Sequence, residues 1–381
     1  MPKETYQPFR EPIYITRPLL PDVDVILEKL REVWASQWLT NNGPQHQIFE
    51  QKLLESLRVP YLSLFNNGTI ALIVACQSLR LSGEVITTPF SFPATPHVLA
   101  WNNIRPVFCD IEPTTLNIDA DKIESMLTPQ TTGILAVHVF GTPCNVIKIQ
   151  EVADRYGLRV IYDAAHAFGV EIGGRGIGTY GDISMFSFHA TKLFHTAEGG
   201  ALTFNDLHLK SRIDLLKNFG IKNENEVVMP GINGKMTEIQ AALGLVLLDY
   251  VDGERRKRAG LLKTYRECLE GVDGLSFLPY DMDGVEKSLQ YFVIRIDEKL
   301  FGCSRDRVYE EFKKYNVFTR KYFFPLCSAY TCYKHLPSSS HANLPVAEKI
   351  ACEVLCMPFY GGLSVDDVVR ICDILKSLRH Q

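Results

Sequence analysis

Lys192 stands in a sequence context that indicates chemistry. In FSFHATKLFHTAEGGAL (186–202) it lies between an apolar run and an acidic residue followed by two glycines. A surface lysine needs no such neighbours, whereas a lysine amine that forms a Schiff base with an aldehyde must be held in place. A second apolar run, VIYDAAHA, carries Asp163, and His166 follows three residues later. The two runs supply a candidate reactive amine and a candidate carboxylate partner.

Two further segments offer groups that a phosphate and an aromatic ring need. FNNGT places Gly68 and Thr69 before an apolar segment, and Ser187 lies shortly before Lys192. Backbone N–H groups at a helix start, helped by hydroxyls, bind phosphate. Phe92 in TTPFSFPAT could cover one face of a ring. Each residue alone has a structural explanation, such as a turn or an N-cap. Together they provide one candidate for each contact that pyridoxal 5'-phosphate (PLP) requires.

Short apolar runs that alternate with helical segments must position these side chains. Strands are expected in LSLF, EVITTPFSF, PVFCDI, TGILAVHVF, LRVIYD, SMFSF and LQYFVIRID, helices in DVDVILEKLREVW, TIALIVACQSL, IQEVADRYG, RDRVYEEFKKYN and SVDDVVRICDILKSL, and a loop in ASQWLTNNGPQHQ (35–47). This alternation predicts an α/β domain with a mostly parallel sheet, in which ligands bind at the carboxyl ends of the strands. A long helical segment begins near residue 235, so we expect a large PLP-binding α/β domain over 1–250 and a small C-terminal domain over 251–381.

Composition argues against several kinds of partner. The net charge is −4, from 40 basic and 44 acidic residues, and gives no basic surface for nucleic acid. No run approaches the length of a membrane span, and the first residues lack the apolar core of a signal peptide. The ten cysteines are scattered without CxxC pairs, as is usual for reduced core cysteines. We therefore expect a cytoplasmic protein that binds neither nucleic acid nor membranes.

Two other motifs are poor matches to known sites. The spacing of Cys327, Cys332, His335 and His341 fits no familiar zinc pattern, so no metal is expected. Residues 176–181 fit GxGxxG by letter, but a dinucleotide fingerprint must open a helix. The strand-like DISMFSF follows instead, which favours a glycine-rich turn.

The order of motifs resembles a known family over nearly the whole chain. NGTIAL, PFSFPAT, DAAHAFG, GDISMFSFHATK, EGGAL and GINGKMTEIQAALGL occur in this order. The sequence is similar to the DegT-type sugar aminotransferases, a branch of the fold-type-I PLP enzymes. The resemblance implies a large three-layer domain with a mostly parallel central sheet and a smaller C-terminal α+β domain.

The resemblance also implies a role for individual residues. Lys192 would carry the cofactor, and Asp163 would hold its pyridine nitrogen. Phe92 would stack on the ring, while Ser187 and the turn at Gly68 and Thr69 would bind the phosphate. Two further contacts follow: Asn233 would reach the phosphate of the neighbouring subunit, which implies a homodimer with shared active sites, and His166 takes a place beside the ring where many relatives have glutamine or glutamate.

The implied activity is transamination of a sugar. L-glutamate would donate the amino group to a nucleotide-linked keto-sugar, most simply a 4-keto-6-deoxyhexose on dTDP or UDP. The amino sugar would serve a surface polysaccharide, such as lipopolysaccharide O-antigen, or a glycosylated metabolite. Thr40, Asn41, Arg320 and Tyr322 are the candidate substrate contacts. Cys327 stands where relatives often have histidine, which leaves some substrate-side contacts open.

Other functions remain compatible with these residues. A 3-keto-sugar or aminocyclitol aminotransferase could have an identical cofactor site. A catalytically idle PLP-binding regulator is a different class, disfavoured because no DNA-binding segment or basic face is evident. A nicotinamide oxidoreductase would require a helix that starts at Gly181.

Overall fold

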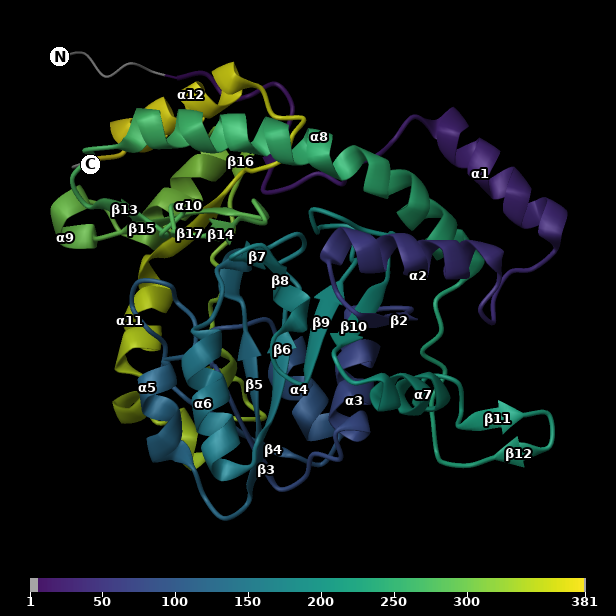
Figure 1. Ribbon diagram of the computed structural model, residues 1–381. Helices are drawn as coiled ribbons and strands as arrows, with labels where there is room; N and C mark the ends of the chain where they lie inside the picture. Colours follow the sequence, from purple (N-terminus) through teal and green to yellow (C-terminus); the bar gives the residue numbers. More distant parts are fainter. Residues whose placement is uncertain (1–5, 380–381) are drawn as a thin grey trace.

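A seven-stranded sheet forms the centre of the computed structural model, which describes residues 6–379 (Figure 1). Its order is β2-β10-β9-β6-β5-β3-β4. The strands are β2 (Tyr61–Phe65), β10 (Gly200–Phe204), β9 (Ile183–Ser187), β6 (Arg159–Asp163), β5 (Thr131–Val137), β3 (Glu84–Thr87) and β4 (Arg105–Phe108). Only β10 runs against its neighbours in this sheet. The predicted mostly parallel sheet is therefore confirmed.

Helices cover both faces of the sheet, because successive strand residues point to opposite sides. Ile161 packs into a core shared with α3 (Gly68–Ser78), α4 (Ala94–Trp101) and α7 (Leu207–Leu216). Tyr162, the next residue, faces the opposite core with α6 (Val146–Tyr156). On that second face, α2 (Pro44–Leu57) packs against α8 (Glu238–Leu269). The result is the expected three-layer arrangement.

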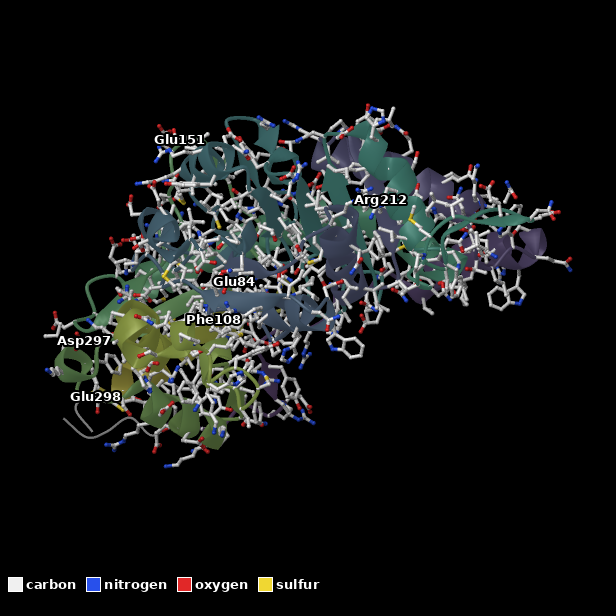
Figure 2. The ribbon with its side chains drawn as sticks, turned by 90° about the horizontal axis from the view of Figure 1, so that it is seen from below. Glu84, Phe108, Glu151, Arg212, Asp297 and Glu298 are labelled. Carbon is white, nitrogen blue, oxygen red and sulfur yellow. The ribbon has the colours of Figure 1, made fainter. Side chains whose placement is uncertain are left out.

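The helix α8 connects this sheet to a second, smaller one. Thr237 and Gln240 form a capping box at its start, which satisfies backbone donors of the first turn. Its far end packs on α12 (Val365–Ser377) and on the sheet β13-β15-β17, with strands Leu275–Phe277, Phe292–Ile296 and Val354–Met357. The short helix α9 (Glu298–Phe301) marks this end of the molecule, opposite Arg212 of α7 (Figure 2).

The expected domain boundary at residue 250 falls inside the unbroken helix α8, and it stays a prediction. No helix among residues 6–379 combines the length and apolarity that a membrane crossing needs. Residues 1–5 and 380–381 of the expected domains lie outside the described part.

Two sequence expectations are decided by the structure. The glycine-rich segment 176–181 contains one 3-10 turn, Ile177–Thr179, and leads into β9 rather than into a helix. The oxidoreductase alternative thereby loses its supporting motif. The predicted loop 35–47 is wrong at both ends, because α1 (Val23–Ser36) includes its first two residues and α2 begins at Pro44. The buried Glu238 carboxylate accepts the N–H groups of Gln45 and His46 at 2.7 and 3.0 Å, a long-range cap.

Candidate active site

The sheet brings the ends of two expected strands together. Asp163 is the last residue of β6 and Ser187 the last residue of β9. These strands are parallel neighbours, with Asp163 opposite Met185. Lys192 lies in the loop that follows β9, residues 188–199. The candidate carboxylate and amine therefore share the carboxyl edge of the sheet, where α/β proteins bind ligands.

Asp163 is a buried carboxylate with specific donors. Thr95 Oγ1 donates to Oδ2 at 3.0 Å, and the Ala165 N–H donates to Oδ1 at 3.0 Å. Burial raises the pKa of Asp163, whereas both hydrogen bonds and the positive charge of Lys192 oppose the rise. Each oxygen accepts one of these bonds and keeps capacity for a further donor. The Asp163 carboxylate can thus accept a hydrogen bond from a protonated ring nitrogen.

A chain of hydroxyl groups stands behind this carboxylate. The hydroxyls of Ser91 and Thr95 lie 2.7 Å apart, and both side chains are buried. Because Thr95 has one hydroxyl hydrogen and gives it to Asp163, Ser91 must donate to Thr95. Sequence reasoning missed both residues. The segment PFSFPAT indicates only Phe92 as a candidate, because a buried serine or threonine has no sequence signal of its own.

The Lys192 amine is tuned toward its neutral form. Burial lowers its pKa from the ordinary 10.5 to about 8, while the negative charge of Asp163 acts in the opposite direction. The loop that carries it is anchored by Leu193 and Phe194, which are fully buried. Phe194 stacks on Phe168 with ring centroids 4.7 Å apart. With this pKa, roughly a tenth of the amine is unprotonated at pH 7, far more than for an ordinary lysine.

His166 belongs to an aromatic cluster, formed with Phe140 and Phe323, close enough to Lys192 to be influenced by its charge. Its ring lies parallel to Phe140 and Phe323, at centroid distances of 6.2 and 6.0 Å. Burial, and next the charge of Lys192, lower the pKa of His166 well below its ordinary value. Nδ1 accepts the Phe140 N–H at 3.3 Å, so the neutral ring carries its proton on Nε2.

The start of helix α3 has backbone N–H groups that could bind an anion. The Asn67 side chain caps the Ile70 N–H at 2.8 Å, and within residues 6–379 the N–H groups of Gly68 and Thr69 have no hydrogen-bond acceptor. A Cβ on Gly68 would come within 3.1 Å of the Ser187 Cβ, so the turn and the serine adjoin. A Cβ on Gly200 would lie 2.8 Å from the Gly68 nitrogen. Both glycines keep this cradle open.

The remaining candidates are less enclosed. Tyr322 is linked to the aromatic cluster by Tyr291. The ring centroid of Tyr291 lies 5.8 Å from that of Tyr322 and 5.1 Å from that of His166. Arg320 is exposed and its backbone pairs with Cys356. The other four candidates are also exposed: Thr40, Asn41, Thr69 and Asn233. The ring of Phe92 is 57% exposed, which leaves a face available for stacking.

These residues fit PLP. A buried carboxylate has capacity for one more donor, an amine has a lowered pKa, and a helix start offers two N–H groups beside a serine. A methyl group in place of a hydrogen on Gly68 or Gly200 would fill the space at the start of α3. No group of three or more His, Cys, Asp or Glu in residues 6–379 is placed to hold a metal ion. Cys327 instead donates its thiol to the Ser91 carbonyl at 3.1 Å.

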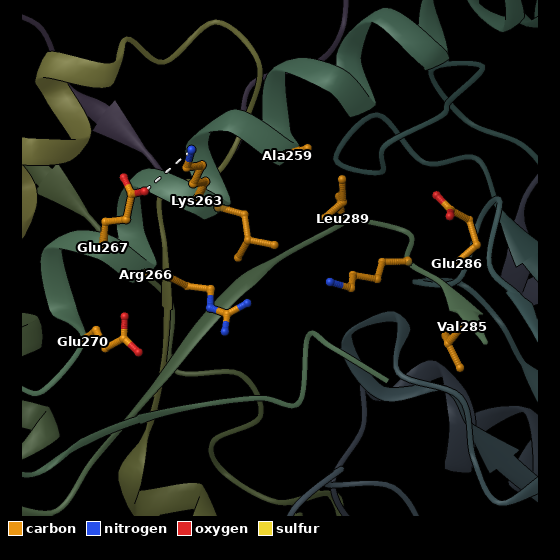
Figure 3. Close-up of a pocket in the computed structure, with 10 residues that line it drawn as sticks. Ala259, Lys263, Arg266, Glu267, Glu270, Val285, Glu286 and Leu289 are labelled. Atoms are coloured by element: carbon orange, nitrogen blue, oxygen red, sulfur yellow. Dashed lines mark ion pairs between the residues drawn. The ribbon is translucent and has the colours of Figure 1, made fainter. Parts of the chain in front are cut away.

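A surface hollow of about 480 Å³ lies elsewhere, between the second half of α8 and residues 285–289 (Figure 3). Its cations are already matched by acids. Arg266 and Lys287 both pair with Asp281, and Lys263 pairs with Glu267. The cations that line this hollow within residues 6–379 are therefore all paired, and none of its lining residues belongs to the Lys192 site.

Comparison with known proteins gives consistent matches. The model of the DegT/DnrJ/EryC1/StrS aminotransferase family matches residues 22–376. A dTDP-4-amino-4,6-dideoxy-D-glucose transaminase of Escherichia coli is 48% identical, over 95% of this chain and 98% of that protein. The Shigella dysenteriae protein of the same name is 43% identical, over 97% and 100%.

A solved structure gives the same answer in three dimensions. The crystal structure of DesI in the presence of its TDP-sugar product superposes with a TM-score of 0.92 at 37% identity, covering 97% of this chain and 94% of that one. The three-layer domain and the smaller sheet thus form the fold-type-I architecture of PLP sugar aminotransferases. The chain belongs to the DegT/DnrJ/EryC1/StrS aminotransferase family, and it is a transaminase.

Proposed function

We propose that this transaminase uses PLP to move the amino group of L-glutamate onto C4 of a dTDP-linked 4-keto-6-deoxyhexose. The observation that carries the cofactor assignment is the placement of Lys192 and Asp163 together at the carboxyl ends of parallel strands, where the charge of each shifts the pKa of the other. The sugar assignment rests on the relatives named dTDP-4-amino-4,6-dideoxy-D-glucose transaminase, which match over nearly their full length. The product would serve a surface polysaccharide or a glycosylated metabolite.

The chain's own residues would hold the cofactor at three points. Bound PLP supplies an aldehyde for the amine and a ring that accepts electrons from the substrate. The Asp163 carboxylate would hold the ring nitrogen in its protonated form. The N–H groups at the start of α3 and the Ser187 hydroxyl would bind the phosphate. Phe92 would cover one face of the ring, and His166 would lie beside it.

Lys192 would then act as the proton carrier. With PLP bound, the neutral Lys192 amine would take a proton from the α-carbon of the amino donor. In the second half of the reaction, Lys192 would deliver a proton to the sugar carbon that receives the amino group. Its pKa of about 8 lies close to neutral pH, where an acid–base group works in both directions. Such positioned proton transfer contributes about 10²–10⁴-fold in rate.

A homodimer with shared active sites is part of the proposal. Several large apolar side chains are exposed near Asn233 and on the projecting hairpin β11–β12 (Ile221–Asn223, Glu226–Val227; Figure 1). They are Phe219, Ile221, Val227, Val228 and Ile232. A contiguous apolar patch on a monomer indicates an interface. Docking of this hairpin on a second copy would bring Asn233 to the partner's phosphate turn.

The visible spectrum and one substrate panel test this function. Protein saturated with PLP should absorb in the near-visible, and L-glutamate should bleach the band while it forms 2-oxoglutarate. The bleached protein should convert dTDP-4-keto-6-deoxyglucose to an amino sugar, detected by mass spectrometry. Lys192→Ala should stay folded and lose turnover. Faster reaction with UDP-linked, 3-keto or aminocyclitol substrates would replace the sugar assignment, and absence of glutamate turnover would favour a PLP-binding regulator.

A further inference from the structure

The side chain of Gln290, which is distant in sequence, forms hydrogen bonds to the residues on both sides of Lys192. Its side-chain Oε1 accepts the Leu193 N–H at 2.6 Å, and its Nε2 donates to the Thr191 carbonyl at 3.1 Å. These two groups belong to the residues on either side of Lys192. One buried amide therefore holds the backbone before and after the lysine at once.

Gln290 is itself held by a buried network. Its N–H donates to Ser288 Oγ at 3.1 Å, and its carbonyl accepts from Arg258 at 3.3 Å. The Arg258 guanidinium is paired with Glu254 at 2.6 Å on the same face of α8. Glu254 also accepts the Gly361 N–H at 2.8 Å. Gln290 immediately precedes Tyr291, whose ring packs against His166.

This arrangement differs from an ordinary core hydrogen bond. The loop 188–199 is closed at its ends by backbone bonds, from Phe188 to Gly199 and from Thr196 to Phe188, at 2.8 and 2.9 Å. At its middle, the Lys192 N–H donates to the His189 carbonyl. The peptide groups on each side of the lysine are tied to Gln290. That amide thus restrains the two peptide groups between which the Lys192 side chain leaves the backbone.

We propose that Gln290 is a positioning residue for the Lys192 amine, an inference that rests on the proposed function of Lys192. It acts through the backbone and does not touch the reacting atoms. Its contribution lies in holding the amine where it meets the aldehyde and the substrate carbon. A misplacement of about 1 Å in such a geometry can cost on the order of 10²-fold in rate.

Two variants separate the two hydrogen bonds. Gln290→Leu keeps similar volume and removes both bonds, whereas Gln290→Glu in its ionised form keeps an acceptor for the Leu193 N–H but has no donor for the Thr191 carbonyl. Gln45→Leu is the matched control, because Gln45 is also buried but its side chain bonds to Glu32. The measurements are amide hydrogen exchange at Leu193 and at Thr196, kcat and KM for glutamate, and the rate at which PLP with borohydride labels Lys192.

The expected results are specific to positioning. In Gln290→Leu, exchange at Leu193 should rise at least about tenfold while exchange at Thr196 stays unchanged. Labelling of Lys192 and kcat should fall about 10–100-fold, with KM within about threefold of wild type. Gln290→Glu should keep slow exchange at Leu193, and its kcat should lie between those of wild type and Gln290→Leu. Gln45→Leu should match wild type.

The outcomes that overturn the proposal are distinct from failure of the proposed function. If wild-type protein gives no label on Lys192, the function itself fails and the inference with it. If wild type is labelled and Gln290→Leu exchanges faster at Leu193 but keeps normal labelling and kcat, Gln290 is only structural. Unfolding of Gln290→Leu leaves the decision to Gln290→Glu, where unchanged kcat and labelling would reject positioning.

Discussion

Thr95 Oγ1 donates a hydrogen bond of 3.0 Å to Asp163 Oδ2, and neither side chain is open to solvent. The two residues are far apart in sequence, one in the second position of α4 and the other at the end of β6. A buried carboxylate loses much of its hydration and needs such donors to remain ionised. Ser91 extends the chain by a second hydroxyl at 2.7 Å, and bonds in such chains polarise one another.

Thr95→Val should therefore make the Asp163 carboxylate harder to ionise. Loss of a hydrogen bond to a charged group costs about 1.5–3 kcal/mol in the free energy of unfolding. The folded-state pKa of Asp163 is raised. Between the pKa of this carboxyl in the unfolded chain and its pKa in the folded protein, the folded protein binds more protons, so stability falls as pH rises through that range. The variant should enlarge this loss, so its destabilisation should be greater in neutral than in weakly acidic buffer.

Urea unfolding at both pH values measures this effect. Thr95→Ser, which keeps the hydroxyl, is the control and should behave like wild type apart from the lost methyl group. Equal destabilisation of Thr95→Val at both pH values would show that the hydroxyl does not stabilise the charge on Asp163.

The Lys192 amine should titrate near pH 8 in the folded protein, against 10.5 for an ordinary lysine. Between these values the unfolded chain binds more protons than the folded one, so the contribution of Lys192 to stability rises with pH in that window. Asp163→Asn removes the negative charge that favours the ammonium form. The amine pKa of this variant should fall further, and its transamination should be slower.

Competitive acetylation of cofactor-free protein across pH, followed by mass spectrometry of the peptide containing residue 192, gives the amine pKa. Lys192→Arg supplies the unlabelled control. An upward shift of the pKa in Asp163→Asn would contradict an attractive interaction between the two groups.

Sequence reasoning could find the residues that end apolar runs but not those that act across the fold. Asp163 and Ser187 each end an apolar run that is expected to be a strand, and Lys192 follows closely, so the sequence predicts all three at the carboxyl ends of the strands. Thr95 and Gln290 lie in helix and loop segments, and their partners are set by packing between distant elements.

The helix α2 was missed for a related reason. Its first turn is stabilised by the Glu238 carboxylate, about which the local sequence PQHQ holds no information. The preceding turn formers, which include Asn41 with φ 65° and Asn42 with φ 59°, are the stronger local signal.

Gly200→Ala should weaken the phosphate site selectively. The new Cβ would lie 2.8 Å from the Asn67 carbonyl carbon and the Gly68 nitrogen, and these backbone atoms cannot yield without moving the turn. Affinity for PLP should fall at least about tenfold, because helix N–H groups must be aimed at the anion. Affinity for pyridoxal, which has no phosphate, should change much less.

Fluorescence titration with both compounds checks this ratio. Gly260→Ala is the matched control, since a Cβ there meets nothing within 4 Å and the residue lies inside α8. That change should leave PLP affinity unaltered and add about 0.5–1 kcal/mol to stability. An equal loss of affinity for pyridoxal and PLP in Gly200→Ala would remove the phosphate from this turn.

Subunit mixing should reveal whether Asn233 acts on the neighbouring chain. Asn233 is exposed and follows the apolar segment proposed as the interface. If each site takes Lys192 from one chain and Asn233 from the other, a heterodimer of Lys192→Ala and Asn233→Ala chains contains one site with both residues intact. In an isologous dimer, equal mixing should give about a quarter of wild-type activity, although each variant alone is weak.

The measurement is glutamate turnover after the two purified variants are unfolded, mixed and refolded together, with each variant treated alone as the control. Recovery depends on trans contribution, because a cis arrangement leaves every site with one defect. A mixture no more active than the sum of its parts, in protein that sedimentation shows to be dimeric, would assign Asn233 to its own subunit. A monomer with full activity would reject the shared site altogether.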